Sequence, residues 1–140
     1  GDLGVVGMLA VELFQTRDGR VLINELAMRP HNSGHWTIDG AVTSQFENHL
    51  RAVLDLPLGD PGLIAPCAVM VNVLGGDKPD MYHPYLHTMA RDPGLKVHLY
   101  GKDVRPGRKN GHVTVVGDDV QDLLVRAHHA ADYFTGVIDE

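Results

Sequence analysis

Two apolar segments joined by a turn place the strongest constraint on how this chain can fold. Val5–Phe14 is an apolar run broken by one carboxylate, Glu12, and a second apolar run, Val21–Glu25, follows after a turn that contains Asp18-Gly19. An Asp-Gly pair between two apolar runs is a strong signal for a β-hairpin. We therefore expect two adjacent antiparallel strands, one carrying Glu12 and the other carrying Glu25.

The two glutamates are candidate metal ligands. If the strands pair in this way, both carboxylates can face one side and share a divalent cation. A few hard oxygen ligands suit magnesium that is bound together with phosphates. The simpler interpretation is an exposed Glu12 and a Glu25 that merely ends its strand. However, Glu12 is embedded in the apolar run Leu9–Phe14, and because burying an unpaired carboxylate is costly, the metal site is favoured.

The segment Asn24–Trp36 presents a carboxylate, a guanidinium, two imidazoles and two carboxamides directly after a strand. Groups of this kind on a loop are typical of a site for an anion or a metal. Arg29 offers a fork suited to phosphate or carboxylate, and His31 can act as a base or a hydrogen-bond donor. We expect His35 and Trp36 to pack the loop onto the body. Zinc is the alternative for the histidines, but it is the weaker one because the single cysteine, Cys67, lies far from them in the sequence.

The rest of the chain alternates helices and strands, which predicts an α/β (α+β) architecture. Ser44 and Glu47 form a capping box that starts a helix with an apolar face, and this helix stops before Pro57. Further elements are expected at Cys67–Leu74, Lys96–Tyr100 and Val113–Val116 as strands, and over Met81–Ala90 and after the cap Asp118 as helices. In the last helix we expect His128 and His129 to be surface residues rather than ligands.

A second dense segment, Tyr100–His112, contains four basic residues within eight positions, namely Lys102, Arg105, Arg108 and Lys109. Its glycines and proline fix a loop between two strands. A solvated hairpin tip is the simpler interpretation. Because the whole chain carries a net charge of -6, a concentrated basic loop is instead a candidate anion site, for example for a sugar phosphate.

The totals exclude several function classes. A net charge of -6 argues against general nucleic-acid binding. No apolar run approaches the roughly 20 residues that a membrane-spanning helix needs. The single cysteine, Cys67, cannot form an internal disulfide, which fits a reducing compartment and predicts a cytoplasmic protein.

Long motifs in both halves of the chain resemble one known family. They are Val11–Phe14, Ile23–Ala27, Arg29–Thr37, Ser44–Glu47, His49–Ala52, Leu56–Gly59, Tyr100–Lys102, Arg105–Lys109 and Gly111-His112. Together they resemble the C-terminal half of the ATP-grasp purine enzymes, most closely the 5-(carboxyamino)imidazole ribonucleotide synthetases. One departure is Met28, where many relatives carry proline, and this changes the stiffness of the loop more than its chemistry.

The resemblance implies a ligase of de novo purine biosynthesis. Such an enzyme uses ATP and bicarbonate to make carboxyphosphate, which carboxylates the exocyclic amine of 5-aminoimidazole ribonucleotide. The resemblance assigns Glu12 and Glu25 to magnesium, or to manganese in its place, and it assigns Asn24 and Glu25 to the ATP phosphates. The residues that match the surroundings of bicarbonate and carboxyphosphate are Arg29, His31, Asn32 and Lys102. Those that match the ribonucleotide phosphate site are Lys102, Arg105, Arg108 and Lys109.

The resemblance also sets the expected domains and partners. It implies that residues 1–58 form the C-terminal part of an ATP-grasp domain and residues 59–140 a small, β-rich C-terminal domain. We expect the basic loop and the glutamate pair to line a common cleft. The family's N-terminal domain and lid have no counterpart here, and the chain starts without a natural beginning, so we expect a fragment that is inactive without its missing N-terminal part. A homodimer is also implied.

Two alternative functions differ in chemistry. The formate-dependent ATP-grasp glycinamide ribonucleotide transformylase shares the glutamate pair and an Arg-Pro-His stretch, but Asn32–His35 reads differently in relatives of that type. A non-catalytic ribonucleotide-binding or assembly module is the second alternative. Paired metal carboxylates speak against it, because a pure binding module has no use for Glu12 and Glu25.

Overall fold

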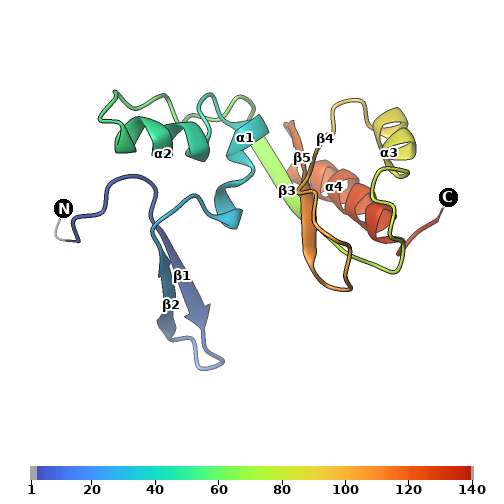
Figure 1. Cartoon of the computed structure of the whole chain (residues 1–140), viewed down its shortest axis with the longest axis horizontal. Helices are drawn as coiled ribbons and strands as arrows, with labels where there is room; N and C mark the ends of the chain where they lie inside the picture. Colours follow the sequence, from blue (N-terminus) through green and yellow to red (C-terminus); the bar gives the residue numbers. More distant parts are fainter. Residues whose placement is uncertain (1–2, 140) are drawn as a thin grey trace. The chain divides into compact units, whose positions relative to one another are not determined.

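The computed structural model describes residues 3–139, which form two compact units that divide between Gly62 and Leu63 (Figure 1). Each unit has its own secondary structure and is treated separately. The predicted domain limits at residues 58 and 59 stay a prediction, and so does the expected common cleft. Among the described residues, no helix has both the length and the apolar character needed to cross a bilayer.

The first unit begins with the predicted hairpin. Strand β1 (Ala10–Gln15) pairs antiparallel with strand β2 (Val21–Ala27), and the turn between them closes through a hydrogen bond from Gly19 N to Thr16 O of 2.9 Å. Three short helical elements follow: η1 (Asn32–Gly34), α1 (Thr37–Gly40) and α2 (Gln45–Val53). The expected loop after β2 therefore contains the 3-10 turn η1.

Helix α2 starts as the capping box predicts, but its apolar face is not a core. The Ser44 side chain accepts a hydrogen bond from Glu47 N. However, Phe46, Leu50 and Val53 are all exposed, as are the large apolar residues on both strands of the hairpin. The apolar face of α2 was expected to be a core face, and this expectation was wrong for the described residues, since the face stays largely exposed.

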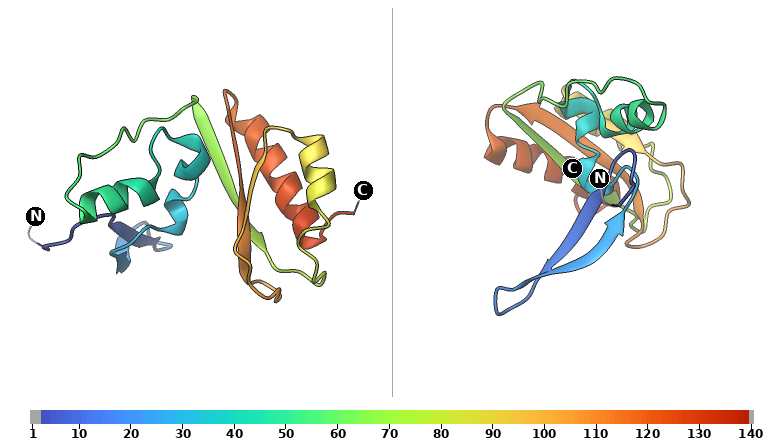
Figure 2. Two further views of the ribbon diagram at one scale, coloured as in Figure 1. Left: turned by 45° about the horizontal axis from the view of Figure 1, so that its top comes forward. Right: turned by 90° about the vertical axis from the view of Figure 1, so that its left-hand side faces the viewer.

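The second unit is an antiparallel sheet covered by helices (Figure 2). Its strands lie in the order β3 (Cys67–Leu74), β5 (Lys109–Gly117) and β4 (Lys96–Leu99). Helix α4 (Val120–Thr135) packs along β3 and β5, and helix α3 (Tyr85–Arg91) lies beside α4. The core that these elements bury includes Val73, Val113, Val115, Leu123, Ala127, Ala130, Ala131 and Phe134. The alanines let α4 approach the sheet closely.

Three predicted boundaries differ from the structure, each for a local reason. Helix α3 begins at Tyr85 rather than Met81, because Pro84 stands at its N-cap and the Asp80 carboxylate instead accepts hydrogen bonds from the two backbone N–H groups of Tyr82 and His83. The cap of α4 is Asp119 rather than Asp118, since its carboxylate accepts from Gln121 N at 2.8 Å. Strand β5 begins at Lys109, so the basic segment is partly strand.

Phe134 should be the most costly of the core side chains to truncate. It is 1% exposed and meets Tyr85 edge to face, with ring centroids 5.4 Å apart. We expect Phe134→Ala to lower the free energy of unfolding in urea by about 3–5 kcal/mol, because it leaves a cavity between α3 and α4. Leu86→Ala is the control, since Leu86 is 81% exposed and its loss should change stability by less than about 0.5 kcal/mol. Equal effects of the two substitutions would contradict this packing.

Candidate functional site

Glu12 and Glu25 are direct neighbours across the hairpin. They occupy opposite positions in the register of β1 and β2, so both side chains leave the same face of the hairpin. Glu12 is half-buried and Glu25 is exposed. The structure therefore brings together the two carboxylates that the sequence suggested as a pair.

A β-bulge adds Asn24 to the same face. Glu12 pairs with Glu25 while Leu13 pairs with Ile23, which leaves Asn24 as an extra residue in β2. A bulge sets two residues of one strand against one residue of the other, so Asn24 does not alternate to the far side. Its Nδ2 donates to Glu12 Oε2 at 3.0 Å. The Asn24 amide thus orients one oxygen of the Glu12 carboxylate.

His31 occupies the other oxygen of the same carboxylate. Its Nε2 lies 2.6 Å from Glu12 Oε1, and its Nδ1 accepts a hydrogen bond from Ser33 N at 3.3 Å. Because Nδ1 accepts, the ring proton lies on Nε2 and is donated to Glu12. Ligand atoms of Glu12, Glu25 and His31 all lie within 4.8 Å of one another. The two carboxylates fit a hard divalent cation such as magnesium or manganese, while His31 holds Glu12 through its Nε2–H.

A buried amide, that of Gln45, fixes the position of His31. Gln45 is 4% exposed, and its Oε1 accepts from His31 N at 2.9 Å while its Nε2 donates to His31 O at 2.7 Å. The same Nε2 lies 2.9 Å from His35 Nδ1, which agrees with the packing role expected for His35. A Cβ at position 34 would collide with the Gln45 amide, so Gly34 allows this close approach.

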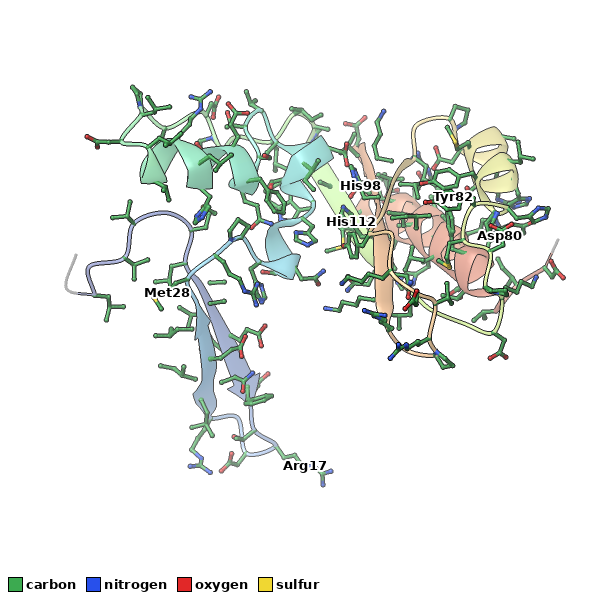
Figure 3. The ribbon with its side chains drawn as sticks, viewed as in Figure 1. Arg17, Met28, Asp80, Tyr82, His98 and His112 are labelled. Carbon is green, nitrogen blue, oxygen red and sulfur yellow. The ribbon has the colours of Figure 1, made fainter. Side chains whose placement is uncertain are left out.

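Arg29 and Asn32 lie on either side of His31 in sequence. A cavity of about 250 Å³ is lined by Arg29, His31, Ser33 and Gln45, among others. Arg29 is exposed and donates from Nη1 to the carbonyl of the adjacent Pro30 at 3.1 Å. Asn32 begins the 3-10 turn η1 and is half-buried. Figure 3 shows the side chains of this region beside the labelled Met28. Arg29 gives this cavity one cationic wall.

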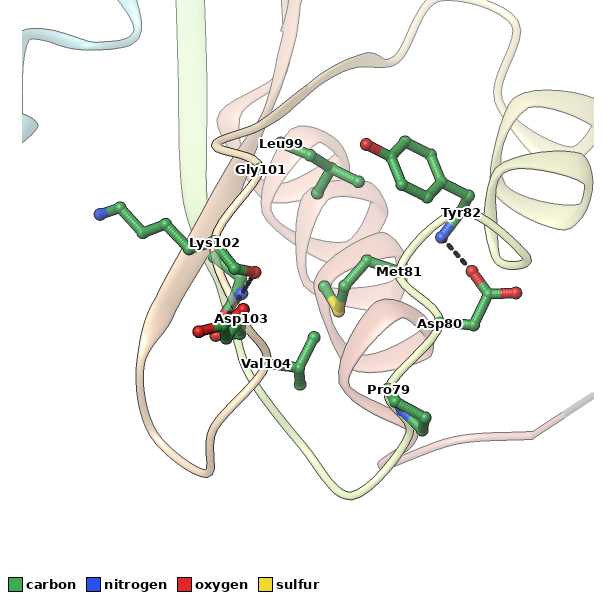
Figure 4. A pocket seen from close by; sticks show the side chains of 10 residues that line it. Pro79, Asp80, Met81, Tyr82, Leu99, Gly101, Lys102, Asp103 and Val104 are labelled. Atoms are coloured by element: carbon green, nitrogen blue, oxygen red, sulfur yellow. Dashed lines mark hydrogen bonds between the residues drawn. The ribbon is translucent and has the colours of Figure 1, made fainter.

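In the second unit, Lys102 lies on the loop that joins β4 to β5. Its ammonium is 5.1 Å from the centroid of the Tyr100 ring, which is a cation–π contact. The Asn110 side chain, which is buried, donates from Nδ2 to Lys102 O at 2.9 Å and so fixes the backbone of the loop. In Figure 4 the Lys102 side chain extends away from a cavity of about 420 Å³ that Met81, Tyr82 and Val104 help to line.

The other predicted phosphate ligands are all exposed, and the two arginines contact Asp103. Arg105 Nη2 is 3.9 Å from Asp103 Oδ2, and Arg108 Nη1 donates to Asp103 O at 3.2 Å. Lys109 is the first residue of β5. Gly75 at the end of β3 anchors the loop, since its N donates to Arg108 O at 2.7 Å and its carbonyl accepts from Gly107 N at 2.9 Å.

Two stacked histidine rings on one face of the sheet support Tyr100. The Tyr100 hydroxyl lies 2.7 Å from Nδ1 of His112, which is 1% exposed, and the His112 ring stacks on His98 with centroids 4.7 Å apart. Burial raises the pKa of the Tyr100 phenol, so the hydroxyl stays protonated at neutral pH. Because the strands pair His98 with His112, their alternation places both rings on one face.

Sequence reasoning missed the residues that hold the site. These residues are buried: Gln45, Asn110 and His112. They are distant in sequence from the residues that they hold, so the contacts form only when the chain folds. The sequence contains only a weak indication of these roles. Gln45 lies inside the capping box Ser44–Glu47, and His112 belongs to the motif Gly111-His112. By contrast, the predicted metal ligands Glu12 and Glu25 lie opposite each other on the hairpin, which local sequence signals predicted.

Comparisons with known proteins identify both units. Residues 1–46 match the family described as the ATP-grasp domain, and residues 68–126 match the family described as the phosphoribosylaminoimidazole carboxylase C-terminal domain. The order of the two matches follows the chain. The α/β fold predicted from the sequence is confirmed.

Relatives and solved structures carry the same names. The N5-carboxyaminoimidazole ribonucleotide synthase of Mycobacterium tuberculosis is 60% identical over 137 residues, which are 96% of this chain and 32% of the relative. That of Corynebacterium ammoniagenes is 51% identical, over 94% of this chain and 33% of the relative. The chain therefore spans about a third of the length of these relatives.

Two crystal structures extend the likeness to the fold. The phosphoribosylaminoimidazole carboxylase ATPase subunit from Aquifex aeolicus superposes with a TM-score of 0.77 at 45% identity, covering 94% of this chain and 39% of that one. The Aspergillus clavatus N5-carboxyaminoimidazole synthase in complex with ADP and 5-aminoimidazole ribonucleotide gives 0.75 at 37% identity, covering 91% and 35%. On this combined evidence, the chain belongs to the N5-carboxyaminoimidazole ribonucleotide synthase family of ATP-grasp ligases.

Proposed function

We propose that this chain takes part in the ATP- and bicarbonate-dependent carboxylation of 5-aminoimidazole ribonucleotide. The cluster of Glu12, Glu25 and His31, whose ligand atoms lie within 4.8 Å, carries this proposal. The names of the relatives support it, since an Aspergillus clavatus relative is described in complex with ADP and 5-aminoimidazole ribonucleotide. A homodimer and a cytoplasmic location are part of the proposal.

In this proposal the hairpin holds the cation that neutralises the ATP phosphates. Glu12 and Glu25 supply carboxylate oxygens, and Asn24 contacts the phosphates while it orients Glu12. A divalent cation in this position lowers the cost of bringing a nucleophile to a phosphate by neutralising its developing charge. The protein supplies position, because the bulge and the register fix all three side chains on one face.

Arg29, His31 and Asn32 receive the small anion. The guanidinium of Arg29 offers two N–H groups to the oxygens of bicarbonate, and a carboxyphosphate would keep the same interaction. His31 is held by Gln45 and Glu12 within hydrogen-bond distance, so its Nε2 proton can be donated to an oxygen of the anion once Glu12 turns toward the cation. These groups stabilise negative charge where the reaction develops it.

Lys102, Arg105, Arg108 and Lys109 form the proposed ribonucleotide phosphate site. Lys102 has a second role as a cation beside carboxyphosphate. The loop carries four positive charges and one carboxylate, Asp103, in a chain whose net charge is -6. A phosphate that displaces Asp103 from Arg105 would gain two nearby cations without moving the anchored backbone.

The metal assignment can be tested with the 140-residue chain and Mn²⁺, whose binding is followed by electron paramagnetic resonance. We expect Glu12→Gln and Glu25→Gln each to weaken Mn²⁺ binding at least about tenfold, because each removes a charged oxygen ligand. Asp18→Asn is the matched control: it lies on the same hairpin, but its carboxylate is bonded to Thr16 and Arg20 in the turn. Binding that depends as much on Asp18 as on Glu12 would overturn the assignment.

The reaction can be tested in the intact ligase that contains this chain. We expect ATP turnover to depend on bicarbonate and not on formate, and Lys102→Ala to lower turnover about 100-fold through the loss of a charge beside the reacting anion. Lys96→Ala in strand β4 is the control and should retain activity.

Three outcomes of that experiment discriminate between the functions. Turnover that requires formate would replace the proposal by the transformylase. Full ribonucleotide binding with no turnover, unaffected by replacing Glu12 and Glu25 with glutamine, would favour the binding module. Bicarbonate-dependent turnover by the 140 residues alone would contradict the expectation that they are inactive by themselves.

Tyr100 should tune Lys102 through its ring more than through its hydroxyl. Tyr100→Phe keeps the ring under the ammonium and loses only the hydrogen bond to His112, whereas Tyr100→Leu removes both contacts. In the intact ligase we expect Tyr100→Leu to raise KM for the ribonucleotide about fivefold and Tyr100→Phe to raise it less, since a cation–π contact contributes about 1 kcal/mol. Equal KM values for both variants would refute this role.

A further inference from the structure

A pair of histidines joins helix α3 to helix α4 in the second unit, away from the basic loop's cations. His87 on α3 and His129 on α4 place their Nε2 atoms 3.2 Å apart, with ring centroids separated by 5.5 Å and planes tilted by 35°. Both rings are half-buried. The proposed function uses neither residue, and the sequence suggested only a surface role for His129.

The separation of the two nitrogens matches that of two ligands on one metal ion. Zinc binds imidazole nitrogens at about 2.0–2.1 Å in a tetrahedral arrangement, which places two such nitrogens about 3.3 Å apart. A small rotation of each ring directs both lone pairs at a shared ion, which then replaces the proton that the two nitrogens share. The backbone need not move, because both helices are already packed.

The surroundings hold one ring in place and leave room for further ligands. The His87 ring stacks on Tyr133, with centroids 3.9 Å apart and planes at 13°. This stacking sets the plane of the His87 ring and still allows a small rotation within that plane. His129 lines a cavity of about 170 Å³ together with Thr88 and Asp92. Asp92 accepts two hydrogen bonds from Arg126, at 2.8 and 3.0 Å, so the nearby positive charge is already balanced.

We propose that His87 and His129 form a binding site for a late first-row divalent transition metal ion such as zinc, nickel or copper. Two neutral imidazoles favour these ions over magnesium and calcium, which prefer oxygen. With two protein ligands, the site exchanges its ion readily, and water in the adjoining cavity completes the coordination. The bound ion links α3 to α4. This inference is independent of the proposed ligase activity.

The test titrates Co²⁺, Ni²⁺, Cu²⁺ and Zn²⁺ into the 140-residue chain by calorimetry, with excess magnesium present to occupy the glutamate pair. We expect affinity to rise from cobalt through nickel to copper. His87→Ala and His129→Ala should each weaken zinc binding at least about tenfold. The matched controls are His128→Ala, an exposed neighbour on α4, and His31→Ala at the glutamate cluster, and both should retain the site.

A second measurement covers variants that fail to fold. In the unsubstituted chain, paramagnetic Cu²⁺ should broaden the ring signals of Tyr133, which stacks on His87, at lower concentration than those of Tyr100. His87→Gln and His129→Gln keep a polar side chain, and each should abolish the earlier broadening of Tyr133 relative to Tyr100. The proposal is overturned if the chain binds no ion, if Tyr133 is not broadened first, or if His128→Ala weakens binding as much as His129→Ala.

Discussion

The contact between Glu12 and His31 is the interaction on which the candidate site depends. At 2.6 Å it joins the strand that carries the carboxylate to the loop that carries the imidazole. Because the buried amide of Gln45 holds His31 from the opposite side, the metal cluster is supported by helix α2 as well as by the hairpin.

The hydrogen bonds of Gln45 explain how the loop after β2 is held in one conformation. A loop that presents Arg29, His31 and Asn32 must satisfy its own backbone groups. Here Gln45 accepts from His31 N and donates to His31 O, while Ser33 N is capped by the His31 ring. Gln45 and Ser33 thus hold the backbone and the ring of His31, and Arg29 is exposed on the same loop.

The second unit uses a different solution to hold its cations. The basic loop has no core of its own, since Lys102, Arg105 and Arg108 are all exposed. Its backbone is fixed by Asn110 and Gly75, and its lysine is supported by the ring of Tyr100. Buried polar groups therefore orient exposed charges in both units, and this keeps desolvation cost low while limiting the positions that the charges adopt.

Local patterns were enough to predict the hairpin, most strands and the glutamate pair. The Asp-Gly turn sets the pairing of Gln15, Phe14 and Leu13 with β2, and the β-bulge that follows places Glu12 opposite Glu25. Long motifs were enough to predict the family and the fold. The limits of α3 and α4 were missed because adjacent residues such as Asp118 and Asp119 offer equivalent caps, and the choice rests on which carboxylate meets the free N–H groups.

What the sequence determined by itself is therefore the chemistry and its local order: which carboxylates pair, which loop is basic, and which residues start a helix. Only the tertiary structure decided which side chains support that chemistry. Gln45 lies 14 residues from His31 along the chain, and His87 lies 42 residues from His129. The physical reason is that a turn or cap depends on neighbours within a few residues, whereas such contacts form only when separate elements pack together.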